Sequence, residues 1–219
     1  MKQRVFVYHI LLGIAKPLMH ILYRPRIIGR EHIPQSGGAV IAGNHMHAFD
    51  PVLIDCATKR VVRTLAKKAL HDGKFGFIFR SAGTIPVDLH AKKNPAALQA
   101  AIEALNNGDL VNVSPEAKRN YTNELLLPFK YGAVKMSAET GAPIVPYAIA
   151  GAYKLFGKQR PTVVFGEPFT PQNDDLYAAN KALYERIAAL LRQITDAKIL
   201  AEKHYTSFDD WSNEHAQTS

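Results

Sequence analysis

The sequence predicts an α/β fold in which a mixed, largely parallel β-sheet is flanked by helices. Short apolar runs typical of strands alternate along the chain with segments of helical periodicity, which is the pattern of α/β proteins. Two polar clusters, residues 44–50 and 114–120, each directly follow such an apolar run. Because open α/β sheets bind ligands at the carboxyl ends of their strands, the two clusters are expected to form one site.

The elements are expected in the following order. Strands are predicted at residues 39–42, 61–66, 83–87, 110–113, 144–149 and 162–165. Helices are predicted at residues 51–58, within 69–79, from 94 to 107 and at 132–140. Asn94 is the expected cap of the third helix, with Pro95 at its first position. Apolar residues spaced 4-3-4-3-4 between Leu183 and Ala201 predict a long amphipathic helix.

The first 25 residues are expected to form a helical membrane-associating segment, and residues 26–219 the main domain. Residues 5–23 are strongly apolar, but His9, Lys16, Pro17 and His20 interrupt them, unlike a typical transmembrane span. No small-residue cleavage site follows, so a signal peptide is not expected. Pro17 is expected to kink the helix or to divide it into two.

On a helix, the polar positions of this segment form one narrow stripe on an otherwise apolar surface: His9, Gly13, Lys16 and His20. Three arginines follow shortly after it: Arg24, Arg26 and Arg30. A helix that lies in the plane of an anionic membrane surface has this pattern. The alternative is a helix packed on the protein's own core.

Charge and cysteine content narrow the possible partners and the compartment. The chain has 27 Lys+Arg and 19 Asp+Glu, for a net charge of +8. Nucleic acid, an anionic membrane or an acidic small substrate would each fit this excess. No motif of interleaved aromatic and basic residues supports nucleic acid, which is therefore not an expected partner. Cys56 is the only cysteine, so no intrachain disulfide can form, and a reducing compartment fits.

The cluster at residues 44–50 contains a candidate pair for proton transfer. His45 stands at the end of a predicted strand, and Asp50 follows where a helix begins. Histidine is suited to proton transfer near neutral pH, and a carboxylate can fix its tautomer. The chain has no GxSxG motif, and Cys56 lacks a histidine pattern. A histidine base acting directly on an acceptor hydroxyl therefore fits better than a covalent intermediate.

Other interpretations of these residues remain open from the sequence. The pair alone could be a solvated histidine and a helix-capping aspartate. His45, His47 and Asp50 could also begin the metal site of a hydrolase. A metal site would need further ligands. Four other histidines are not spaced along the sequence as metal ligands usually are: His71, His90, His204 and His215. A separate group of cations could hold an anion such as phosphate: Lys118, Arg119 and Lys130.

Five blocks in order resemble the glycerolipid acyltransferase family, whose members acylate glycerol 3-phosphate and lysophosphatidic acid. NHMHAFD at residues 44–50 resembles the family's NHxxxxD motif, and SPEAKRN at 114–120 is similar to its FPEGTRS block. Residues 67–88 resemble its second block, and PFKYG at 128–132 and APIVPY at 142–147 its remaining signatures. The resemblance spans roughly residues 25–170.

The resemblance implies a glycerol-3-phosphate acyltransferase-like fold and acyl transfer to a hydroxyl of a lysophospholipid or glycerol-phosphate-type acceptor. Acyl-CoA or acyl carrier protein would be the donor, without a metal or redox cofactor. His45 would be the general base, and Asp50 would orient it. Glu116 and Arg119 would position the acceptor, and Asn44 would shape the turn or orient His45. The place of such a protein is the cytoplasmic face of the cell membrane, in phospholipid biosynthesis or remodelling.

The chain departs from the family pattern at several positions. His47 stands where a serine is frequent, and Ser114 replaces phenylalanine. Ala117 and Lys118 replace glycine and threonine, and Leu89 replaces an arginine expected to contact phosphate. Nearby cations could compensate for that loss: Lys92, Lys93 or Lys118. A non-catalytic lipid-binding protein is a further alternative that these changes leave open.

Overall fold

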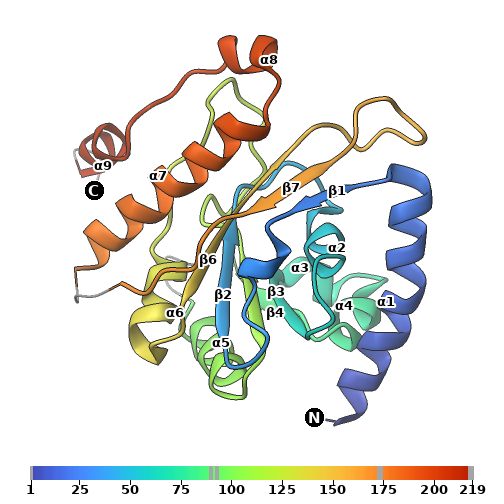
Figure 1. The fold of residues 1–219 in the computed structure, drawn as a ribbon. Coiled ribbons are helices and arrows are strands. Elements are labelled where there is room, and N and C mark those ends of the chain that lie inside the picture. Colours follow the sequence, from blue (N-terminus) through green and yellow to red (C-terminus); the bar gives the residue numbers. More distant parts are fainter. Residues whose placement is uncertain (1, 89–90, 92–93, 172–174, 217–219) are drawn as a thin grey trace.

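The computed structural model describes residues 2–88, 91, 94–171 and 175–216 (Figure 1). Within them the strands are β1 (Arg26–Ile28), β2 (Ala39–Gly43), β3 (Val62–Lys67), β4 (Ile85–Val87), β5 (Leu110–Val113), β6 (Ile144–Ala150) and β7 (Thr162–Phe165). They form one sheet in the order β1-β7-β6-β2-β5-β3-β4. All neighbouring strands are parallel except β6 and β7. The predicted mixed, largely parallel sheet is therefore confirmed.

Helices pack on both faces of this sheet. They are α1 (Lys2–Tyr23), the 3-10 helix η1 (Arg30–His32), α2 (Asp50–Asp55), α3 (Lys68–Asp72), α4 (Gly76–Ser81), α5 (Pro95–Asn106), α6 (Gly132–Thr140), α7 (Leu176–Ile194), α8 (Ala197–Ala201) and α9 (Phe208–Ala216). Alternate residues of β2 point to opposite faces. Val40 and Ala42 pack in a core with α5, α6 and α7, whereas Ala39 and Ile41 pack with α2. Every residue of β2, β5 and β6 is buried, as central strands covered on both faces require.

Three local predictions differ from the structure. Asn94 precedes α5, but its side chain does not cap the helix: its amide exchanges hydrogen bonds with the backbone N–H and carbonyl of Asp88. The long helix predicted up to Ala201 ends at Ile194, because Thr195 is extended and the carboxylate of Asp196 caps α8 instead. Of the two effects predicted for Pro17, division of α1 is wrong, since the helix runs uninterrupted with the proline on its exposed side, and a kink stays a prediction.

Helix α1 packs on the protein through one face only. Its buried side chains are Tyr8, Leu12 and Met19. The Tyr8 hydroxyl donates to Asp55 Oδ1 at 2.8 Å, and the Lys16 amine donates to the carbonyl of Thr58 at 2.7 Å. Lys16 of the predicted polar stripe therefore points toward the protein.

The other face of α1 is apolar and exposed. Its large side chains are between 49 and 68% exposed: Phe6, Ile10, Ile14, Leu18 and Ile21. The stretch Phe6–Tyr23 is long and apolar enough to cross a membrane, judged by length and composition. The helix thus combines a core-packing face with an apolar face that the described residues leave uncovered.

Candidate active site

The candidate site lies along the carboxyl edge of four neighbouring strands. His45 follows β2, Glu116 follows β5, Lys67 ends β3, and Tyr153 follows β6. Parallel pairing of β2 with β5 brings the two polar clusters together, since the backbone N–H of His45 donates to Glu116 Oε1 at 3.1 Å. The two clusters therefore lie side by side, and their action as one site stays a prediction.

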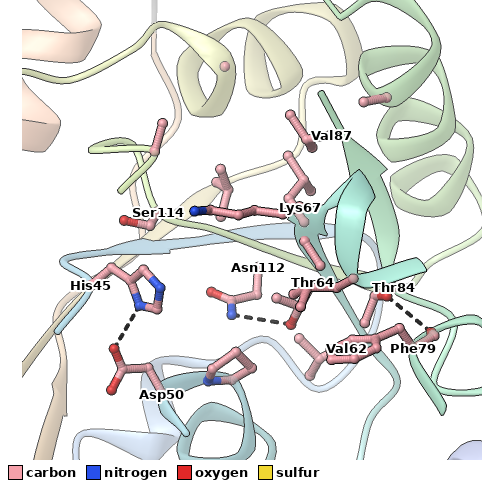
Figure 2. Close-up of a pocket in the computed structure, with 18 of the residues that line it drawn as sticks. His45, Asp50, Val62, Thr64, Lys67, Phe79, Thr84, Val87, Asn112 and Ser114 are labelled. Carbon is pink, nitrogen blue, oxygen red and sulfur yellow. Dashed lines mark hydrogen bonds and ion pairs between the residues drawn. The ribbon is translucent and has the colours of Figure 1, made fainter. Parts of the chain in front are cut away.

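His45 and Asp50 form a direct hydrogen bond (Figure 2). His45 Nδ1 lies 2.8 Å from Asp50 Oδ2, and the same oxygen accepts the backbone N–H groups of Met46 and His47, each at 2.8 Å. The carboxylate is buried at the start of α2, and both His45 and Asp50 line a cavity. Because Asp50 occupies Nδ1, the other ring nitrogen, Nε2, is the one available to a ligand.

Tyr153 completes the hydrogen bonding of this carboxylate, and the sequence did not single it out. Its hydroxyl donates to Asp50 Oδ1 at 2.8 Å, and its ring stacks on His47 with centroids 4.4 Å apart. Burial, together with the nearby Asp50 charge, raises the pKa of the Tyr153 hydroxyl, so it remains a donor at ordinary pH. The available signal was its position just after a buried strand, at the same edge as His45.

Glu116 supports the His45 loop from within the protein. Its second oxygen accepts the backbone N–H of Leu127 at 3.0 Å, and the residue is only 4% exposed. Burial raises the pKa of its carboxyl to about 7. Glu116 does not line the cavity. Its predicted role toward the acceptor stays a prediction, and these contacts favour an indirect role through the His45 backbone.

The side chain of Asn44 also forms hydrogen bonds with backbone groups. Its amide donates to the carbonyl of Ile149 at 2.9 Å and accepts the N–H of the same residue at 2.7 Å. These bonds tie the end of β2 to β6, so the side chain holds the turn that begins the NHMHAFD segment. Like Glu116, Asn44 does not line the cavity.

The predicted cations do gather at the cavity. Lys118, Arg119 and Lys130 are exposed and line it, and Arg119 donates to the hydroxyl of Tyr121 at 3.1 Å. Lys67 also lines the cavity, and in Figure 2 its amine extends toward Ser114. The predictions made for Leu89, Lys92 and Lys93 lie outside the described residues.

The cavity itself is large and mostly apolar. Its volume is about 1380 Å³, and it extends from His45 to the packed side of α1. Its apolar lining comes from α1, β3, α4 and α5, including Leu11, Leu12, Leu65, Ile78, Phe79 and Leu98. Asn112 Oδ1 and Ser114 Oγ are buried without a hydrogen-bond partner in the described structure, and both residues line this space.

The metal alternative gains no support from the geometry. The described residues contain no group of three or more His, Cys, Asp or Glu side chains placed to hold a metal ion. His47 Nδ1 instead accepts the backbone N–H of Phe49 at 3.2 Å, while its ring stacks on Tyr153.

Fold and site together define an α/β protein with a His–Asp pair beside a large apolar cavity. A family model described as Acyltransferase matches residues 24–150, which is more than half of the chain. The chain therefore belongs to the Acyltransferase family, and the resemblance seen in the sequence is confirmed.

Individual relatives agree with this assignment. The 1-acyl-sn-glycerol-3-phosphate acyltransferase of Borreliella burgdorferi is 29% identical over 134 residues, covering 60% of this chain and 53% of the relative. The 1-acyl-sn-glycerol-3-phosphate acyltransferase alpha of Homo sapiens is 27% identical over 157 residues, covering 68% and 55%. The chain thus spans about half the length of the curated relatives it matches.

One solved structure has the same fold. It is the 1-acyl-sn-glycerophosphate (LPA) acyltransferase, PlsC, from Thermotoga maritima, with a TM-score of 0.71 and 23% sequence identity. The match covers 87% of this chain and 80% of that chain.

Proposed function

We propose that this protein is an O-acyltransferase of phospholipid biosynthesis or remodelling. It moves a fatty acyl group from acyl-CoA or acyl carrier protein to a hydroxyl of a lysophospholipid or glycerol-phosphate-type acceptor. The observation that carries the proposal is the hydrogen-bonded His45–Asp50 pair, which opens on a large apolar cavity with cations around it. The relatives named above are acyltransferases of this kind, which supports the same conclusion.

In the proposed reaction, His45 acts as the general base. Nε2 takes the proton from the acceptor hydroxyl as the hydroxyl oxygen attacks the thioester carbonyl carbon. The carbon–sulfur bond then breaks, and the leaving sulfur takes the proton from the imidazolium. Asp50 holds the ring through Nδ1 and stabilises its positive charge, since the carboxylate is buried and fixed by hydrogen bonds.

The two parts of the cavity suit the two parts of the substrates. The apolar lining would hold a fatty acyl chain, because burial of each CH₂ group contributes about 0.8 kcal/mol. Lys67, Lys118, Arg119 and Lys130 would hold phosphate groups of the acceptor or the donor, since charge-assisted hydrogen bonds favour phosphate. The reaction as proposed needs no metal ion or redox cofactor.

The proposal places the protein on the cytoplasmic face of the cell membrane, bound by its N-terminal segment. The exposed apolar face of α1 supports this placement. Residues 1–30 carry six cations and no acidic residue, which favours an anionic surface. Lipid acceptors would then be available in the same bilayer.

The test is a reaction of the purified protein with acyl-CoA or acyl carrier protein thioesters and a panel of lysolipids, followed by mass spectrometry. The expected products are a diacyl lipid and one equivalent of free thiol, with no loss after chelator treatment. Lipid binding without product from either donor would support the non-catalytic alternative. Hydrolysis that a chelator abolishes and zinc restores would support the hydrolase.

A further inference from the structure

The loop that joins β6 to β7 carries two exposed apolar side chains at its tip. We call residues 151–161 the β6–β7 loop; Leu155 is 60% exposed and Phe156 is 66% exposed. The loop extends beside the carboxyl end of α1, at the upper right of Figure 1. Two large apolar groups in water at the end of one loop have no role in the core.

The backbone at Phe156 adds to this observation. Its φ of 52° is in the left-handed region, which is unfavourable for a residue with a β-carbon. The N–H of Phe156 donates to the carbonyl of Leu22 in α1 at 2.9 Å, so the conformation is tied to that helix. The fold thus keeps a phenylalanine where glycine or asparagine would be less strained, while the ring points into solvent.

Positive charge surrounds the apolar tip. Lys154, Lys158 and Arg160 of the loop are exposed, as are Arg24 and Arg26 after α1. None of these five forms an ion pair with another described residue. The sequence has no acidic residue from 1 to 30 or from 151 to 166, so no carboxylate of these segments offsets the charge.

The loop is also joined to α1 in space. The guanidinium of Arg24 donates to the carbonyl of Gly157 at 3.4 Å, and the Tyr23 ring lies 5.7 Å from that of Tyr153. Leu18 and Ile21, exposed at the same end of α1, extend the apolar surface toward the loop.

We propose that the β6–β7 loop is a second membrane-docking element, which inserts Leu155 and Phe156 into an anionic phospholipid bilayer. The surrounding lysines and arginines would contact lipid phosphates, while the two side chains enter the acyl region. An apolar tip inside a rim of unpaired cations favours this partner over nucleic acid, which the cations alone would fit. The inference rests on the membrane association proposed for α1 and adds a contact point on the loop that carries Tyr153.

The direct test places a reporter at the tip. The variant Phe156→Trp is mixed with vesicles of phosphatidylcholine and phosphatidylglycerol, and the parent protein, with its single Trp211, provides the background. The added emission is expected to shift to shorter wavelength and to be quenched by brominated lipid. Vesicles of phosphatidylcholine alone should give a weaker change.

A second experiment compares vesicle binding and thermal stability. The double variant Leu155→Ser with Phe156→Asn should float with anionic vesicles at least about tenfold less than the parent, because two apolar groups are lost from the contact. Its melting temperature should not fall, since asparagine tolerates the left-handed conformation better than phenylalanine. The control Ile199→Ser removes an exposed apolar side chain outside this surface and should bind like the parent.

The outcomes separate this inference from the function proposed above. A parent protein that floats while the reporter at position 156 stays in water overturns the docking role of the loop alone. Equal flotation of the double variant and the parent does the same. A parent that fails to bind vesicles overturns the membrane association together with this inference, while acyl transfer to dispersed lysolipid is measured independently.

Discussion

At the scale of single residues, Asp50 is the centre of the candidate site. Its two oxygens accept four hydrogen bonds, from His45, Met46, His47 and Tyr153. A buried carboxylate with this many donors keeps one orientation, and it therefore keeps the imidazole of His45 in one orientation as well.

The first prediction concerns the base. His45→Ala should lower the acyl-transfer rate by about 10²–10⁴, which is the usual effect of losing a general base. His47→Ala is the matched control and should lower the rate much less, because the side chain of His47 makes no hydrogen bond to Asp50. Steady-state kinetics of both variants test which histidine is the base. An essential His47 with a dispensable His45 would show that the wrong histidine has been assigned.

Tyr153→Phe should lower kcat by roughly threefold to tenfold, the effect of one lost hydrogen bond. Without this donor, Asp50 keeps three of its four hydrogen bonds, so the carboxylate and the His45 ring are held less firmly. Tyr23→Phe removes a hydroxyl from the same aromatic cluster and should leave kcat unchanged. An unchanged kcat for Tyr153→Phe would limit Tyr153 to packing.

Ala117 has a φ of 55° at the position where the family usually has glycine. Ala117→Gly should raise the free energy of unfolding by about 1 kcal/mol, because glycine adopts the left-handed region without strain. Ala138→Gly, at an exposed position in α6, should lower it by about 1 kcal/mol, since glycine weakens a helix. Chemical denaturation measures both changes. Destabilisation by Ala117→Gly would show that the backbone at Ala117 is not strained.

At the scale of elements, the packing of α1 on α2 depends on a buried polar pair. Asp55 of α2 accepts the Tyr8 hydroxyl, and Val62 donates its N–H to the same hydroxyl at 3.0 Å. Burial raises the pKa of the Asp55 carboxyl from 3.8 to about 7. The contact between α1 and α2 therefore includes a carboxylic acid that is protonated in the folded protein below neutral pH.

This pKa shift has a defined sign for stability. Between about pH 4 and pH 7 the folded state holds a proton on Asp55 that the unfolded state has released, so the free energy of unfolding should fall as pH rises. Glu116, with its pKa raised from 4.5 to about 7, adds to the same slope. Urea denaturation across this range should show the fall, and Asp55→Asn should reduce it. An unchanged slope in Asp55→Asn would mean that this carboxyl titrates normally.

At the scale of the whole molecule, a positive net charge accompanies an exposed apolar surface. The net charge is +8, and the exposed face of α1 offers five large apolar side chains. Each basic residue near an anionic surface contributes about 1 kcal/mol at low salt, and salt screens this attraction.

The protein should therefore bind anionic vesicles, and added salt should weaken the binding. Replacing two exposed side chains, Ile10→Asp with Ile14→Asp, should reduce flotation strongly without lowering the melting temperature, because neither residue is buried. The control Lys135→Gln, on α6, lowers the net charge by one outside α1 and should bind like the parent. Equal flotation of the Ile10/Ile14 variant and the parent would show that the exposed face of α1 does not bind the membrane.

The sequence by itself determined the pair of polar clusters and the order of the strands from β2 to β7, but it did not predict β1 or α9. The bounds of β5, β7 and α6 agree with the predictions residue for residue, because apolar periodicity and a terminal glycine act locally. His45 and Asp50 lie five residues apart, so their pairing was also readable from spacing.

Only the tertiary structure decided which residues surround that pair. Tyr153 reaches Asp50 because β6 pairs with β2, and Glu116 reaches the His45 backbone because β5 pairs with β2 on its other side. Neither contact has a local signal, since each joins residues more than 70 positions apart. The same holds for α1, which is apolar around most of its surface, and only packing against the rest of the protein decides which apolar face is buried and which is exposed.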